Sequence, residues 1–137
     1  MKTRFAFSIA AFALAASASA QVDFVKDIQP ILEVHCTKCH GEEQKKGGLR
    51  LHTLADALKG GDNGTALVAG KSKDSKLYTS TTLKLEDDGF MPPPKEGALP
   101  KEQQAKLKQW IDEGAKWPAG LKLGVTKKIN FAKDIQP

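Results

Sequence analysis

The segment "VHCTKCHGEE", Val34–Glu43, contains both cysteines of the chain, and His40 directly follows the second of them. Two cysteines at this spacing fit four kinds of site: a disulfide, a redox dithiol, part of a zinc site, or the attachment point of a covalently bound cofactor. The fold and the function of the whole chain depend on which of these sites is present.

The first three kinds of site lack something that they need. A disulfide between Cys36 and Cys39 would close a very small loop and stabilise the fold little. A thioredoxin-like dithiol normally follows a strand in a βαβ unit, and no such pattern precedes Cys36. A zinc site takes four ligands. Beyond the two cysteines and His40, the sequence offers only His35, His52 and carboxylates, without a second paired cluster.

The fourth kind of site fits the residues as they stand, because Cys-x-x-Cys-His is the attachment signature of a c-type haem. Each thiol forms a thioether with one vinyl group, and the two-residue spacing lets both sulfurs face one edge of the macrocycle. The next residue, His40, then lies under the iron. We therefore expect one covalent haem c at Cys36 and Cys39, with His40 as the proximal ligand.

The first twenty residues have the three parts of a secretory signal peptide. Lys2 and Arg4 form a positive start, Phe5–Ala16 is a short apolar run, and Ala18–Ala20 supplies small residues for cleavage before Gln21. The apolar run is too short to span a bilayer, which takes about 20 residues. We expect export to the periplasm or another extracytoplasmic compartment, where haem-attachment machinery acts, and no membrane span in the mature chain.

The second axial ligand is sought among methionine and histidine, the strong-field ligands of haem iron. After Met1 the chain has a single methionine, Met91, within "GFMPPP" (Gly89–Pro94). Consecutive prolines restrict the backbone in advance and would hold the thioether in place. Met91 is therefore our candidate. His52 is the alternative ligand, and otherwise we expect it at the surface or beside a haem propionate.

Apolar spacing predicts helices at both ends of the domain. The first covers Phe24–Lys38, with Asp23 as its N-cap and a break at Pro30. Three more are expected: Leu54–Lys59 after a Thr53 cap, a helix through Ser75–Leu83 after a Ser72 or Asp74 cap, and Pro100–Glu113, which Gly114 ends. Trp110 lies on the apolar stripe of the last helix, so we place it between helices in the core.

The end of the chain repeats its beginning. "FAKDIQP" (Phe131–Pro137) differs from "FVKDIQP" (Phe24–Pro30) at one position. We expect a signal peptide at 1–20, one domain at 21–118, and a linker with the truncated start of a second, similar domain at 119–137. No second Cys-x-x-Cys-His follows the repeat, so we expect a single haem.

Five segments together resemble a known family: "DFVKDIQPILEVHCTKCHG" (Asp23–Gly41), "KGGLRL" (Lys46–Leu51), "GKSKDSKLY" (Gly70–Tyr78), "FMPPP" (Phe90–Pro94) and "LKQWIDEGAKWP" (Leu107–Pro118). They resemble the planctomycete-type cytochrome c domain, a class I, His/Met-ligated variant found in exported bacterial proteins. The resemblance implies an all-α, cytochrome c-like fold. Three to five short helices would surround one covalently attached haem, and the first and last would cross beside it.

The resemblance also implies roles for individual residues. Cys36 and Cys39 would carry the thioethers, His40 the proximal bond and Met91 the distal bond to iron. Arg50, in "GGLRL", is a candidate partner for a haem propionate, although a surface arginine fits the sequence equally well.

The function expected from these features is single-electron transfer between redox partner proteins, by a carrier that is not an enzyme by itself. Two alternatives stay open: a redox module of a larger multidomain enzyme, and a haem-based gas or ligand binder. A formal net charge of +5 with no Lys/Arg run longer than two does not indicate a nucleic-acid partner. The oligomeric state does not follow from the sequence.

Overall fold

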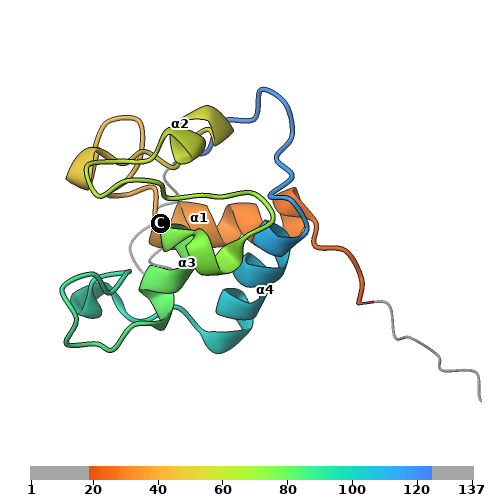
Figure 1. The fold of residues 1–137 in the computed structure, drawn as a ribbon. Helices are drawn as coiled ribbons and strands as arrows, with labels where there is room; N and C mark the ends of the chain where they lie inside the picture. Colours follow the sequence, from red (N-terminus) through yellow and green to blue (C-terminus); the bar gives the residue numbers. More distant parts are fainter. Residues whose placement is uncertain (1–18, 125–137) are drawn as a thin grey trace, which may run out of the picture.

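The computed structural model describes residues 19–124, and its regular elements are short helices (Figure 1). Within this range the α-helices are α1 (Gln29–His35), α2 (Leu54–Lys59), α3 (Lys76–Thr79) and α4 (Lys101–Asp112). Single helical turns lie between and beside them: η1 (Phe24–Ile28), η2 (Lys46–Gly48), η3 (Ser72–Asp74), η4 (Ser80–Thr82) and η5 (Pro94–Glu96).

The expected all-α fold is confirmed for the described residues, which contain no strand and only two isolated bridges. Among these residues no helix combines the length and the apolar character needed to cross a membrane.

The first helical segment is broken near Pro30, as predicted. The Asp23 side chain caps η1 by accepting a hydrogen bond from the Lys26 amide at 2.8 Å, and Pro30 lies in the first turn of α1. The predicted end at Lys38 is wrong, because α1 stops at His35. The amides of Cys36 and Thr37 both donate to the Leu32 carbonyl, so the regular helical hydrogen bonding ends there.

Two of the other predicted helices are confirmed closely. The Asp56 amide donates to the Thr53 hydroxyl at 3.2 Å at the start of α2. α4 begins one residue after Pro100 and ends one residue before Glu113. Gly114 follows with a φ of 107°, a conformation that glycine adopts without steric cost.

The predicted helix between them is shorter than expected. Ser72–Asp74 is itself a 3₁₀ turn, and Ser75 is the residue that precedes α3. The Ser75 hydroxyl donates to the Lys71 carbonyl at 2.8 Å and so ties this turn to the start of the helix. The prediction of Ser72 or Asp74 as the cap is therefore wrong.

An aromatic cluster joins the two ends of the domain. The Phe24 ring lies 5.6 Å from Trp110 and 4.4 Å from Trp117 between ring centroids. Trp110 is 1% exposed, and its indole nitrogen donates to the Lys116 carbonyl at 2.8 Å. The predicted core position of Trp110 is confirmed. Figure 1 shows α4 beside η1 and α1, the arrangement expected of crossing terminal helices.

Residues after Pro118 also pack against the domain. Leu123 is 4% exposed, and its amide donates to the His52 carbonyl at 2.8 Å. The Gly124 carbonyl accepts a hydrogen bond from the Thr37 hydroxyl at 2.8 Å. Residues 119–124 are thus part of the domain surface. The predicted signal peptide up to Ala18 and the repeat Phe131–Pro137 lie outside the described residues.

Acidic pH should weaken one contact that holds α4 to η3. Asp112 accepts hydrogen bonds from Lys108 Nζ at 2.7 Å and from the Ser72 amide at 3.0 Å. These donors lower the pKa of Asp112 to about 2. Because the folded pKa lies below the unfolded value of about 3.9, the stabilisation is present above pH 4 and lost as the pH falls toward 2. We expect Asp112→Asn to lower the thermal midpoint at pH 7 and to flatten its dependence between pH 2 and 4.

The measurement is thermal unfolding by circular dichroism at each pH. The matched control is Glu102→Gln, a change at an exposed carboxylate on the same helix. An Asp112→Asn variant that keeps the wild-type slope between pH 2 and 4 would contradict this assignment.

Candidate functional site

The two cysteines lie on one tight turn that follows α1. The amides of Cys39 and His40 both donate to the Cys36 carbonyl, at 3.2 and 3.0 Å. Both cysteines are free thiols and are half-buried. Burial, and then the neighbouring Cys39, raises the pKa of the Cys36 thiol to about 12. A nucleophilic dithiol needs a lowered pKa, so this environment argues against a thioredoxin-like function.

Thr37 and Gly41 hold this turn in place, a role that was not predicted for either residue. The Thr37 side chain is 1% exposed, and its hydroxyl contacts the carbonyls of Glu33 at 3.3 Å and Gly124 at 2.8 Å. A Cβ on Gly41 would collide with the Thr37 carbonyl. Glycine directly after the histidine is the only signal in the sequence that pointed to this close approach.

His40 is half-buried and presents a neutral imidazole. Burial lowers its pKa, and the backbone of Leu49 and Lys46 partly opposes that shift. The Nδ1 atom is buried and has no hydrogen-bond partner. The His40 carbonyl accepts a hydrogen bond from the Leu51 amide at 2.7 Å, which fixes the backbone at this position. A neutral imidazole is the form that binds a metal.

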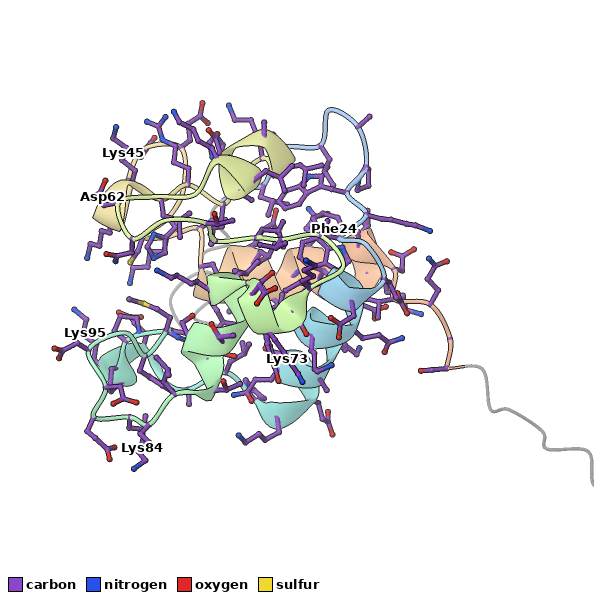
Figure 2. All side chains as sticks on the ribbon, viewed as in Figure 1. Phe24, Lys45, Asp62, Lys73, Lys84 and Lys95 are labelled. Carbon is purple, nitrogen blue, oxygen red and sulfur yellow. The ribbon has the colours of Figure 1, made fainter. Side chains whose placement is uncertain are left out.

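The segment that carries Met91 lies against the cysteine turn. Lys38, between the two cysteines, forms an ion pair of 3.7 Å with Glu96, five residues after Met91. The Met91 amide donates to the Ser80 carbonyl at 3.1 Å, and Phe90 beside it is 5% exposed. In the view of Figure 2, the labelled Lys45 and Lys95 side chains lie on the left of the fold, Lys45 above and Lys95 below. The ion pair therefore brings the predicted proximal and distal segments to one side of the fold.

Arg50 lies in an environment that would favour an anionic partner. Its side chain is half-buried, and the Nε atom is buried without a hydrogen-bond partner. An unpaired buried donor is costly, so a carboxylate at this position would be favourable. A haem propionate is such a carboxylate, which agrees with the predicted role of Arg50.

His52 lies away from the surface. It is 5% exposed, and its backbone carbonyl accepts a hydrogen bond from the Leu123 amide at 2.8 Å. Its Nδ1 lies 3.5 Å from Asp56 Oδ2 without forming a hydrogen bond. The expected surface position of His52 is therefore wrong. Its imidazole is instead next to the first turn of α2.

The residues present fit a covalently bound haem better than the competing sites. The turn supplies two free thiols and a neutral imidazole, and His40 Nδ1 and Arg50 Nε are buried polar atoms in need of partners. Among residues 19–124, no group of three or more His, Cys, Asp or Glu side chains is placed to hold a metal ion.

An apolar groove of about 540 Å³ runs between α2 and residues 117–122, lined by Leu54, Leu58 and Trp117 among others. It includes none of the candidate site residues. We therefore assign the site from the chemistry of the cysteine turn and not from this groove.

The comparison with protein families agrees with this assignment. The model of the family described as Planctomycete cytochrome C matches residues 36–95, a segment that begins at Cys36 and includes Met91. Neither the curated proteins nor the solved structures gave a match to the chain.

Proposed function

We propose, from the premise that residues 36–95 belong to the Planctomycete cytochrome C family, that this chain is an exported single-electron carrier. One haem would be attached covalently through Cys36 and Cys39, with His40 and Met91 as axial ligands. A haem supplies one-electron redox chemistry when it is bound. Membership of the family supports haem binding and electron transfer, and the residues of the cysteine turn support the details.

The observation that carries the proposal is the Lys38–Glu96 ion pair between the cysteine turn and the Met91 segment. Two segments that are far apart in the sequence, each with one proposed ligand, thereby lie together. The ion pair is exposed on both sides and contributes about 1 kcal/mol or less by itself. What the ion pair records is the proximity of the two segments.

Each residue has a defined role in this proposal. His40 provides a neutral nitrogen, which burial favours. Met91 provides a thioether, which raises the reduction potential relative to a second histidine. Phe90, which is buried next to Met91, would keep water from the distal side of a bound haem. The unpaired Arg50 Nε could donate to a propionate. No general acid or base is required, which fits a carrier and not an enzyme.

There are two alternatives to a single electron carrier: a module of a larger redox protein, and a haem-based gas or ligand binder. The repeat of Phe24–Pro30 at Phe131–Pro137 favours a module within a larger redox protein. A gas or ligand binder requires an open position on the iron, and Met91, as the proposed second axial ligand, would fill that position. Export, the haem-attachment machinery and redox partner proteins are parts of the proposal that follow from the first twenty residues and the haem signature.

The experiment that tests the proposal is expression of the full chain in a host that exports proteins and attaches haem. We expect one haem per chain, and a spectrum that changes reversibly as dithionite reduces the protein and ferricyanide oxidises it. A potentiometric titration should follow a one-electron curve. The control is the same chain without residues 1–20, which should stay in the cytoplasm and acquire no covalent haem. An exported, folded chain without haem would contradict the proposal.

A further inference from the structure

Met91 lies on a loop that leaves the helices after η4 and returns to them at α4 (Figure 1). Residues 83–98, which we call the Met91 loop, contain the short turn η5 as their only regular element. The labelled Lys84 and Lys95 side chains belong to this loop (Figure 2). The Met91 amide is tied to the Ser80 carbonyl at 3.1 Å. An irregular loop keeps one side chain in place only if its own ends are held, because a free loop has many conformations.

One side chain on α4 holds both ends of the Met91 loop. Gln104 is 7% exposed, and its Nε2 donates to the Thr81 carbonyl at 3.0 Å and to the Leu99 carbonyl at 3.0 Å. Thr81 lies just before the loop and Leu99 directly after it. A primary amide has two N–H donors, so a single glutamine bonds to both carbonyls at once.

The surroundings of Gln104 fix the direction in which its amide points. The nitrogen faces two carbonyl oxygens, which only accept, and Oε1 lies 3.4 Å from Lys101 Nζ, which only donates. The reverse orientation would leave the Thr81 and Leu99 carbonyls without these donors. Both residues are buried, at 6% and 4% exposure, so losing the two hydrogen bonds would be costly.

The other polar contacts of the Met91 loop do not join its two ends. The Lys38–Glu96 ion pair is exposed, and pairs of that kind contribute little. The Met91–Ser80 hydrogen bond fixes the backbone at the middle of the loop. Gln104 differs from both contacts, because it connects the start and the end of the loop to one position on α4.

We propose that Gln104 is the positioning residue for Met91, and that it keeps the thioether on the iron by holding the two ends of the loop together. This rests on the proposed function, in which Met91 is an axial ligand. With its ends fixed, the loop gains little conformational entropy when Met91 leaves the iron, so the bound state is favoured. Gln104 lies outside residues 36–95, the segment that the family model matches.

The test compares the wild-type chain, loaded with haem, with Gln104→Leu and Gln104→Glu. Leucine fills the buried space and favours a helix, and glutamate keeps the shape of glutamine, but neither an alkyl group nor a carboxylate donates. Both variants should bind carbon monoxide in the ferrous state about fivefold faster, the effect of one net hydrogen bond. In the ferric state, the far-red band of methionine sulfur on iron should fade on heating while circular dichroism still shows a folded protein.

Asp112→Asn is the matched control. It removes hydrogen-bond partners from the same helix, but these partners are Lys108 and the Ser72 amide of η3, away from the Met91 loop. This variant should unfold at a lower temperature and keep the wild-type carbon monoxide rate. If the Gln104 variants also unfold earlier with a wild-type rate and band, Gln104 is only structural and the proposal is overturned.

A second readout does not depend on the axial ligand. Brief digestion of the native chain with trypsin should cut at the exposed Lys84 several-fold faster in both Gln104 variants than in the wild type. Cleavage at Lys59, on α2, should stay unchanged. Equal rates at Lys84 would show that Gln104 does not hold the loop. A wild-type spectrum without the methionine band would contradict the proposed ligation by Met91, and the tryptic rates would still decide whether Gln104 closes the loop.

Discussion

Replacing both cysteines, Cys36→Ala with Cys39→Ala, is expected to remove all covalently bound haem from the chain. In the proposed attachment each thiol would form one thioether, and the sequence contains no other cysteine that could substitute. The measurement is extraction of the denatured protein with acidic acetone, followed by mass spectrometry of the polypeptide. The wild-type chain should retain the mass of one haem, and the double variant should retain none.

The single variants are the matched controls for this experiment. Cys36→Ala and Cys39→Ala should each keep the haem through the remaining thioether. Thr37→Ser keeps the buried hydroxyl that bonds to the Gly124 carbonyl, so it should leave attachment unchanged. Release of haem from the wild-type polypeptide on extraction would show that attachment is not covalent.

The second large effect is expected at Met91. Met91→Ala should open one position on the iron, so that the ferrous protein binds carbon monoxide, which the wild-type protein should bind little. The ferric protein should also lose the weak far-red absorption band that is characteristic of methionine sulfur on iron. Alanine has no atom that reaches a metal, and the stiff segment Pro92–Pro94 limits how far a neighbouring residue can move to replace the thioether. Optical spectra of both oxidation states measure these effects.

His52→Ala is the control that separates the two candidate ligands. It should leave the far-red band and the carbon monoxide response unchanged, because the His52 imidazole lies beside Asp56 at the start of α2. A variant in which His52→Ala opens the iron and Met91→Ala does not would assign the distal bond to His52. Strong carbon monoxide binding by the wild-type protein would instead favour the gas-binding alternative.

The sequence predicted those helices whose ends are set by neighbouring residues. Asp23, Thr53 and Gly114 act through hydrogen bonds or backbone conformations within one turn of their own position, so their effects are visible in the sequence. The end of α1 was predicted three residues too late. It is set by the turn at Cys36 and by Thr37, whose hydroxyl meets Gly124 from the other end of the domain.

The same distinction between local and distant contacts applies to the candidate site. Cys36, Cys39 and His40 are neighbours in the sequence, so their spacing alone predicted the attachment chemistry. Met91 followed because the chain has no other methionine after Met1. The burial of His52 and the unpaired Arg50 Nε did not follow from the sequence, because segments far away along the chain create those environments.

The amino-acid sequence by itself determined the haem signature, the repeat and the local caps, since each depends on residues a few positions apart. Only the tertiary structure decided that Lys38 in the cysteine turn meets Glu96, that the Leu123 amide bonds to the His52 carbonyl, and that Phe24 packs against Trp110 and Trp117. These contacts join residues distant along the chain, and their partners are selected by burial and packing of the whole domain, which no local pattern encodes.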